Sequence, residues 1–459
     1  MDKNSWIGLG LIALILIGFS FFNRPSKQEL ERRQRYQDSI AIVQQQKIAE
    51  QEALQAIEQL SQAESNSPES ASAEQLEAQI VAQYGPFAPS AKGSDDLYTV
   101  ENDLLKLVFS QKGGTLYSAE LKNYKSYGDT INPLCLFRGD ESHLDYTLVT
   151  NNNRILTTSN LYFTPQPIVV DTNGAQILTL RLLTDGEAYL DFVYTIPKNN
   201  YMLDFSIRTH NMQNVLAQNV TSLEMRWYQK IPQHERGRKF EERYAQLQYM
   251  FTNRDMEKLS EQKSDRAKEN GKIRWIAYKD QFFSTVMIAE DAFEGTTLES
   301  NLMSKYSGYV KEYQTTTAAH FDLNDNKNTD FRIYLGPNHY NTLKAYDKDK
   351  QRYEELCLKE LVPLGWKIVA WVNKILVIPM FDLFTSWGMH IGWIILLMTL
   401  VIKLIIFPFT FTSYRSSAMM RALKPQIEEI NAKYPPEKMQ ERQQATMALY
   451  RKAGGNPMA

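Results

Sequence analysis

The chain has 459 residues, with 51 basic and 53 acidic side chains, a net charge of −2 and a mean hydropathy of −0.42. This length indicates two or three structural units rather than one compact domain. The near-neutral charge argues against nucleic acid as a substrate, because nucleic-acid binding normally needs a basic surface. The two cysteines, Cys135 and Cys357, are far apart and have no CxxC or Cys/His spacing. We therefore expect neither a disulfide scaffold nor a zinc site.

The first apolar segment covers residues 6–22 and contains no charged side chain. Its roughly 17 residues are near the lower limit for crossing about 30 Å of hydrocarbon. The residues that follow, Asn23-Arg24-Pro25, do not form a small-x-small cleavage site. An N-terminal transmembrane (TM) helix over 5–23 is therefore predicted, rather than a cleaved signal peptide.

Residues 24–95 have the composition of a linker. The stretch up to residue 63 is rich in Gln, Glu and Ala, which are compatible with helix, but its apolar residues keep no heptad repeat. Ser, Asn and Pro follow, and a cluster of Gly and Pro at 84–89 interrupts regular structure. The pattern predicts a helical, low-complexity linker that acts as a flexible tether, with a docking stalk as the alternative.

Short β-branched and aromatic runs begin at residue 97, separated by turn signals such as Gly-Gly, Asn-Pro, Asn-Gly and Asp-Gly. The predicted strands are 98–100, 104–109, 114–121, 144–149, 177–183, 190–196 and 202–207. Many short strands at this spacing predict an all-β, two-sheet sandwich domain over 96–345. The highly charged stretch 233–272 is predicted to be helical or looped, and strand character resumes at 274–277 and 282–288.

The predicted β-domain has no recognisable catalytic motif. Its histidines stand in no spacing that joins them to a nucleophile or a metal; they are His143, His210, His234, His320 and His339. The polar run His234-Glu235-Arg236-Gly237-Arg238 has the residue types of a site, but we expect it to be an exposed loop. The sequence therefore predicts no catalytic residue, no metal and no cofactor.

Residues 353–384 are predicted to form an amphipathic helix. Apolar side chains recur at helical spacing, at Leu361, Leu364, Ile368, Trp371, Val372 and Ile375. The lysines of this segment fall in a narrow sector on the other side. With Trp366 and Trp371 as anchors, such a helix suits the headgroup boundary of a membrane. The alternative is a buried helix of the β-domain.

A second apolar segment, 387–411, is predicted to span the membrane. Arg415, Arg421 and Lys424 follow it closely, which indicates a cytoplasmic flank under the positive-inside rule. This orientation places the β-domain in the periplasm and the N-terminus in the cytoplasm. A basic group at 24–35 is then an exception to the rule.

Lys403 lies inside this second apolar segment. A charged side chain at membrane depth costs roughly 2.5–3.5 kcal/mol on insertion scales and is a candidate for function. Alternatively, the lysine extends its stem to reach the inner headgroups.

Residues 412–453 are predicted to form a cytoplasmic helical hairpin around Pro435-Pro436. The first helix carries apolar residues at steps of three and four, at Met420, Leu423, Ile427, Ile430 and Tyr434. The second repeats the stripe at Met439, Gln443, Thr446, Met447 and Tyr450. The stripe is predicted to be the seam between the helices. The alternative is a client-binding surface in which Met419, Met420, Leu423 and Met447 make the contacts.

Several motifs fall in order along the chain. They are Trp275…Lys279-Asp280…Phe282-Phe283, Tyr334-Leu335-Gly336-Pro337, Lys403…Phe407-Pro408, Arg421-Ala422-Leu423-Lys424-Pro425-Gln426-Ile427 and Met447-Ala448-Leu449-Tyr450…Asn456-Pro457. With the anchor, the β-domain and the second span, they resemble the YidC-type membrane protein insertases of Gram-negative bacteria. The resemblance covers nearly the whole chain.

This resemblance implies a multi-domain protein of the bacterial inner membrane with a periplasmic β-supersandwich. It implies insertion and folding of inner-membrane proteins, alone or with the Sec translocon, without enzymatic chemistry. The implied partners are nascent inner-membrane proteins, the Sec translocon and membrane lipids, with the ribosome as a further candidate. In the family, a groove open to the cytoplasm and lipid holds a positive residue, and Lys403 matches its position. The cytoplasmic hairpin matches a segment implicated in first client contact.

Two departures from the family pattern are visible. The family more often has Arg at the position of Lys403, and Lys keeps the charge but loses the planar fork of donors. The family also continues after the Asn-Pro motif with further spans, so the resemblance predicts a chain truncated at its C-terminus. Two other classes of function are a membrane-anchored periplasmic carbohydrate-binding or carbohydrate-active protein and a passive membrane scaffold.

Overall fold

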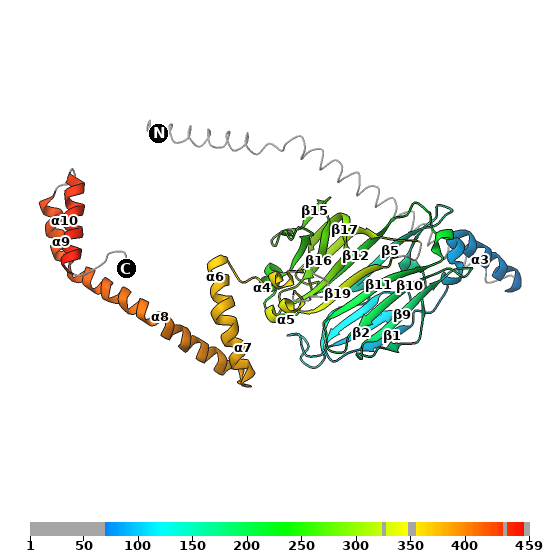
Figure 1. Ribbon diagram of the computed structural model, residues 1–459, viewed down its shortest axis with the longest axis horizontal. Coiled ribbons are helices and arrows are strands. Elements are labelled where there is room, and N and C mark those ends of the chain that lie inside the picture. Colours follow the sequence, from blue (N-terminus) through cyan, green and yellow to red (C-terminus); the bar gives the residue numbers. More distant parts are fainter. Residues whose placement is uncertain (1–68, 324–326, 348–354, 435–437, 454–459) are drawn as a thin grey trace, which may run out of the picture. The chain divides into compact units, whose positions relative to one another are not determined.

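The computed structural model describes residues 69–323, 327–347, 355–434 and 438–453 (Figure 1). The predicted TM helix over 5–23 and the linker up to residue 68 lie outside these described residues. The chain divides after Gly336 into two units. The first contains the β-domain, and the second is helical.

A four-stranded antiparallel sheet opens the β-domain. Its strands follow in chain order as β1 (Leu97–Glu101), β2 (Leu105–Ser110), β3 (Leu116–Leu121) and β4 (Leu134–Arg138). In β2, Leu105, Leu107 and Phe109 are buried while Lys106 and Val108 are only partly covered. This alternation follows from the two-residue period of a strand, which turns every second side chain towards the core.

The rest of the domain is a 15-stranded sheet. Its main path runs β6-β5-β12-β18-β17-β19-β11-β10-β9-β7, and the remaining strands branch from it. The strands are β5 (Ser142–Val149), β6 (Ile155–Thr157), β7 (Thr164–Pro165), β8 (Val169–Val170), β9 (Gln176–Leu183), β10 (Tyr189–Ile196), β11 (Met202–His210), β12 (Ser222–Pro232), β13 (Gln246–Phe251), β14 (Met256–Lys258), β15 (Asp265–Glu269), β16 (Ile273–Lys279), β17 (Phe283–Leu302), β18 (Tyr309–His320) and β19 (Thr329–Pro337).

Side chains from both sheets form a single hydrophobic core. Phe109 of the small sheet lies against Tyr194 of β10, with ring centroids 4.7 Å apart. Within the large sheet, Trp227 of β12 stacks on Tyr278 of β16 at 3.6 Å. The predicted β-rich domain is confirmed, and every strand predicted between 98 and 207 overlaps an observed strand.

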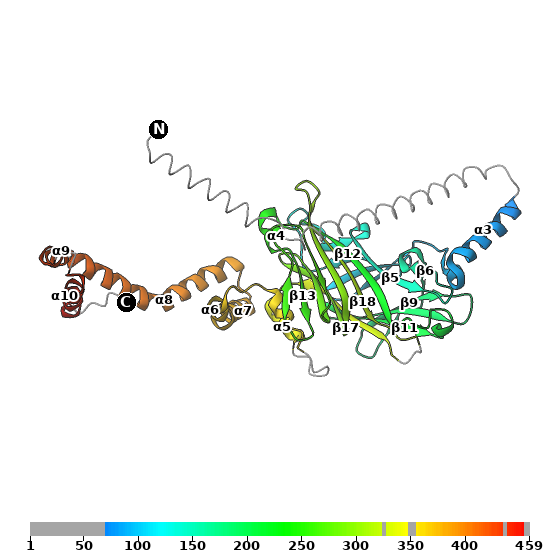
Figure 2. The same ribbon diagram turned by 90° about the horizontal axis from the view of Figure 1, so that it is seen from above.

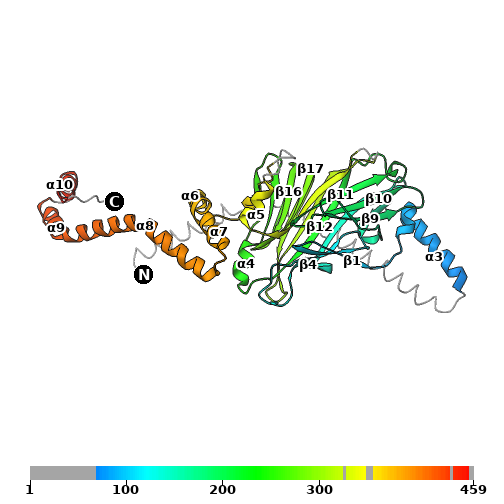
Figure 3. The same ribbon diagram turned by 60° about the horizontal axis from the view of Figure 1, so that its bottom comes forward.

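Two helices mark opposite ends of this domain. Figures 1, 2 and 3 all place α3 (Glu69–Tyr84) at one end and α4 (Arg238–Tyr244) at the other.

The charged stretch 233–272 differs from the prediction. It contains α4, as expected, but also the strands β13, β14 and β15. Glutamines at 246 and 248 interrupt the apolar pattern of β13, yet both are buried, because β13 pairs along its length with β16. Pairing with β16 therefore makes this segment a strand, although its local sequence predicts a helix or a loop.

The end of the predicted linker also differs from expectation. Residues Gly85–Ser90 form a 3₁₀ helix whose Phe87 is fully buried in the β-domain core. The Ser90 hydroxyl donates to the carbonyl of Leu183 at 2.9 Å. The domain therefore begins before residue 96, because this segment supplies part of the core.

The second unit is helical. Its elements are α5 (Tyr340–Tyr346), a 3₁₀ turn (Leu358–Leu361), α6 (Lys367–Val372), a π-helical segment (Asn373–Val377), α7 (Ile378–Ser386), α8 (Ile391–Ala422), α9 (Lys424–Lys433) and α10 (Met439–Lys452). Among the residues that the structure describes, two stretches are long and apolar enough to cross a membrane, Lys367–Ser386 and Ile391–Ala422.

Several predicted boundaries in this unit require correction. The last strand of the β-domain ends at Pro337, and the predicted domain bound of 345 takes in most of α5, which belongs to the helical unit. The helix predicted over 353–384 starts at Lys367, after Gly365 adopts a left-handed φ of 88° that ends any preceding helix. The helix that contains most of the span predicted at 387–411 begins at Ile391 and continues past residue 411 to Ala422, so the hairpin begins later than 412.

Candidate functional site

Lys403 lies on α8, the longest helix of the described chain. At a rise of 1.5 Å per residue, the 32 residues of α8 measure about 48 Å, well beyond the roughly 30 Å of a hydrocarbon layer. Lys403 is twelve residues from Ile391 and twelve from Arg415, which corresponds to about 18 Å in each direction. Its side chain is exposed, and it forms no hydrogen bond or ion pair with the residues that the structure describes.

Four polar side chains share the face of α8 that carries Lys403, beside the apolar Leu396 and Phe407. At 100° per residue, Thr399, Thr410, Tyr414 and Arg421 all lie within about 40° of the line through Lys403. The Thr399 hydroxyl donates to the carbonyl of Ile395 at 2.8 Å, and the Thr410 hydroxyl to that of Ile406 at 3.1 Å. These bonds satisfy the hydroxyl donors within the helix itself. We call these five residues the polar stripe of α8.

Pro408 lies inside α8, one turn beyond Lys403. Proline has no backbone N–H, so the carbonyl of Leu404 loses its helical partner at this point. The Thr412 hydroxyl donates to the Pro408 carbonyl at 2.9 Å. The Leu404 carbonyl, which lacks this N–H partner, directly follows Lys403 along the chain.

The hairpin residues are only partly arranged as predicted. Figure 3 shows α9 and α10 following α8. Met419, Met420 and Leu423 are half-buried, and Leu423 is the break between α8 and α9. Met447 is 45% exposed and Met439 is 61% exposed.

The seam on α10 therefore differs from the predicted stripe. Its half-buried residues are Arg442, Ala445, Thr446, Leu449 and Tyr450, whereas Met439, Gln443 and Met447 are exposed. Thr446 and Tyr450 belong to both sets, so the predicted seam holds for only part of this helix. The exposed methionines are free to contact another molecule.

The segment with the predicted interface anchors is an exposed helix. Trp366 and Trp371 are 71% and 63% exposed, and Phe384 is the one buried side chain between Lys367 and Ser386. Trp387 and Trp393 are also exposed near the turn that joins α7 to α8. Exposed tryptophans at helix ends are typical of a membrane interface.

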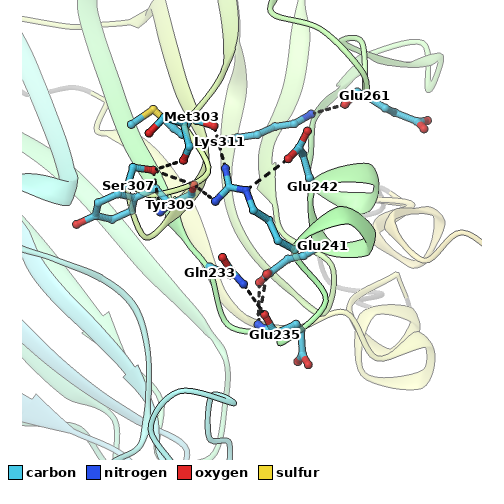
Figure 4. A network of polar contacts seen from close by, with 11 residues as sticks. Gln233, Glu235, Glu241, Glu242, Glu261, Met303, Ser307, Tyr309 and Lys311 are labelled. Atoms are coloured by element: carbon cyan, nitrogen blue, oxygen red, sulfur yellow. Dashed lines mark hydrogen bonds and ion pairs between the residues drawn. The ribbon is translucent and has the colours of Figure 1, made fainter.

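A buried polar network at the α4 end of the β-domain was not predicted from the sequence. His234, predicted to be exposed, is only 5% exposed, and Glu241 is fully buried. The Glu241 carboxylate accepts the backbone N–H groups of His234 and Glu235, at 2.6 and 3.3 Å (Figure 4). Arg238 donates to two backbone carbonyls of the β17–β18 hairpin at 2.7 and 2.8 Å.

Burial controls the ionisation of this network. The pKa of Asp280 is raised well above its usual range by burial and by the charge of Glu241. Burial also raises the pKa of Glu241. The pKa of His234 falls to about 4 and that of Lys279 to about 8, because burial penalises the charged form of each side chain. The Lys279 ammonium donates to the Tyr244 carbonyl at 2.8 Å, which ties α4 to β16.

This network holds loops together rather than presenting a reactive group. Its donors and acceptors are mostly engaged with backbone groups of neighbouring segments. The available sequence signal was the pair Lys279-Asp280 placed directly between two apolar strands, where a charged pair is out of pattern.

Comparison with known proteins identifies both units. Residues 97–379 match the model of the YidC periplasmic domain, and residues 383–459 match that of the 60Kd inner membrane protein family. A membrane protein insertase YidC of Parabacteroides distasonis is 44% identical over the whole chain, which covers 71% of that relative. One from Porphyromonas gingivalis is 35% identical with the same coverage.

The chain belongs to the YidC family of membrane protein insertases.

Solved structures add only weak likenesses to this assignment. YidC from Thermotoga maritima is 13% identical, with a TM-score of 0.32, over 70% of this chain and 71% of that one. A putative mutarotase from Salmonella typhimurium is 9% identical, with a TM-score of 0.31, over 54% and 92%. The membership in the YidC family rests on the sequence matches, and the predicted family is confirmed by them.

Proposed function

We propose that this YidC-family chain inserts inner-membrane proteins by offering Lys403 and the polar stripe of α8 to the hydrophilic segments of a client. The observation that carries the proposal is the axial position of Lys403, about 18 Å from both Ile391 and Arg415. A lysine stem extends about 6 Å, so this position favours a wet groove over snorkelling to the headgroups.

Charge attraction would supply the insertion step. A carboxylate about 4 Å from the Lys403 ammonium gains about 4 kcal/mol at an effective dielectric of 20, against about 1 kcal/mol in water. This gain lowers the cost of moving an acidic client segment part-way across the membrane, after which apolar client helices partition into lipid. The mechanism requires no catalytic residue, metal or cofactor.

The proposal also assigns the other segments of the chain to positions relative to the membrane. The α6–α7 segment lies at the periplasmic headgroup boundary, with Trp366 and Trp371 as anchors. The β-domain lies in the periplasm, and the N-terminus and the hairpin lie in the cytoplasm. The exposed Met439 and Met447 suit first contact with a client, because methionine adapts to varied apolar surfaces. Nascent inner-membrane proteins are the clients, with the Sec translocon and the ribosome as proposed partners.

Replacing Lys403 tests the proposal. In the full-length protein, Lys403→Leu should slow insertion of a client with an acidic translocated tail by about ten-fold, or ~1.4 kcal/mol. Lys403→Arg should retain most activity because it keeps the charge. Insertion is measured in proteoliposomes as protease-protected client.

Two controls sharpen this test. Lys424→Leu removes a similar charge outside the apolar stretch and should leave insertion near the parent rate. A client whose tail carries no acidic residue should respond little to Lys403→Leu. If Lys403→Leu inserted the acidic client at the parent rate, the proposal would be wrong, and a passive scaffold would be the better explanation of the role of α8.

A further inference from the structure

The α4 end of the β-domain exposes a group of large apolar side chains. The exposed fractions are 58% for Tyr127, 84% for Ile131, 65% for Phe240, 49% for Phe282 and 99% for Tyr306. They come from α4 and from three loops, namely β3–β4, β16–β17 and β17–β18. We call these five residues the apolar rim. Clustered exposure of this kind marks an interaction surface, whereas scattered exposed residues do not.

Backbone contacts bring these loops together around α4. The N–H of Tyr127 donates to the carbonyl of His234 at 2.8 Å, which joins the β3–β4 loop to the segment before α4. Arg238 of α4 donates to the carbonyls of Met303 and Tyr309, which flank the hairpin tip with Tyr306.

The buried network of Glu241 and Asp280 fixes the position of the third loop, β16–β17. Asp280 and Glu241 interact, and the N–H of Asp280 donates to the carbonyl of Phe283 at 2.8 Å, closing the tight turn that displays Phe282. Glu241 sits on α4, one residue beyond Phe240. The network thus fixes the rim as one surface, so that little conformational entropy is lost when it is covered.

The exposed charges around the rim are mainly basic. Lys125, Arg236, Lys239, Arg243 and Lys305 are all exposed and lie on the same loops and on α4. Arg236 also lies over the Tyr127 ring, 5.6 Å from its centroid. Aromatic and basic side chains in alternation are typical of surfaces that enter a lipid headgroup layer. Lysine is by contrast depleted at protein interfaces.

The chain leaves the β-domain at this same end. β19 begins at Thr329 beside the end of β18, and Arg332 then binds Glu290 of β17 at 2.7 Å. β19 therefore runs back along β17 and reaches Pro337 beside Phe283, where β17 starts. The membrane-length stretch that begins with α6 follows thirty residues later.

We propose that the apolar rim docks the β-domain onto the surface of an anionic bilayer. Its aromatic and aliphatic side chains enter the headgroup layer while the surrounding lysines and arginines contact lipid phosphates. The docking is separate from the insertion step at Lys403 and is measured without any client.

A fluorescent label on the rim tests the docking. In the full chain, with Cys135→Ser and Cys357→Ser, an environment-sensitive probe is attached at Tyr306→Cys. The protein is reconstituted in phosphatidylcholine vesicles with and without phosphatidylglycerol. A quencher near the headgroups should reduce probe emission about two-fold when phosphatidylglycerol is present, and less without it.

A probe at Ile155→Cys is the matched control. Ile155 is 72% exposed on β6, which pairs with the end of β5 farthest from Gln229 of β12 and therefore lies at the opposite end of the domain. The combined Ile131→Ser, Phe240→Ser and Phe282→Ser variant should bring quenching at 306 close to that at 155. Equal quenching at the two sites in the parent chain would overturn the proposal. A second result would also overturn the proposal: a probe at 306 that is shielded from water but is not quenched by the headgroup quencher. Protein rather than lipid would then cover the rim.

Discussion

His234 shows how burial changes the chemistry of a single residue. Its side chain is 5% exposed and faces the Phe283 ring at 6.0 Å, and its pKa falls to about 4 because burial penalises the imidazolium. The backbone N–H of the same residue donates to the buried Glu241 carboxylate. His234 therefore contributes as a neutral side chain that fills an apolar site.

The shift predicts a pH dependence of stability. Between pH 6.5 and pH 4 the unfolded chain binds a proton at His234 that the folded chain does not bind, so stability is lost as pH falls through this window. His234→Gln removes this loss. When the pH is lowered from 6.5 to 4, the parent should therefore lose about 3 kcal/mol more unfolding free energy than the variant does. Thermal unfolding of the full chain in detergent measures it.

His143→Gln is the control for that experiment. His143 is exposed on β5 and stacks on Tyr228 at 5.8 Å. Its replacement removes an exposed ring and should change the unfolding free energy at pH 7 by less than about 0.5 kcal/mol. If the His234→Gln profile ran parallel to that of the parent, burial of the imidazole would not have the energetic effect described.

The 3₁₀ helix Gly85–Ser90 shows that a short element can belong to a distant core. Its sequence, Gly-Pro-Phe-Ala-Pro-Ser, indicates only a break in regular structure. Phe87 nevertheless inserts into the β-domain, and the N–H of Asp185 donates to the Pro86 carbonyl at 2.8 Å. Because the Phe87 ring is buried in the core, this segment is part of the domain and not of the linker.

Phe87→Ala should destabilise the β-domain by about 3–5 kcal/mol, because it removes a fully buried ring and leaves a cavity. Leu76→Ala on α3, where Leu76 is 49% exposed, should change stability by less than about 0.5 kcal/mol. Denaturant unfolding of the full chain in detergent compares the two. If Phe87→Ala had a similarly small effect, this segment would belong to the linker and not to the core of the β-domain.

At the scale of the whole molecule, the proposed orientation in the membrane rests on charges next to the apolar stretches. Arg415 and Arg421 near the end of α8, and Lys424 after it, support a cytoplasmic hairpin, and the proposal therefore has the β-domain on the other side. In a chain with Cys135→Ser and Cys357→Ser, a membrane-impermeant maleimide should label Ile155→Cys in spheroplasts. It should label Met447→Cys only after lysis. The reverse pattern would invert the proposed topology.

The sequence by itself determined the elements that depend on local periodicity and length. The strand alternation in β2, the apolar length of α8 and the polar stripe through Lys403 are all properties of neighbouring residues. The motifs that indicate the YidC family are likewise linear, which is why the family could be predicted.

Only the tertiary structure decided which polar residues are buried and which apolar residues are exposed. Glu241 and His234 lie in a charged run, and they are buried because loops far along the chain close over them. β13 is a strand because β16 pairs with it, and Met447 is exposed because α9 meets another side of α10. Burial depends on contacts between segments distant in sequence, and a local pattern contains no information about those contacts.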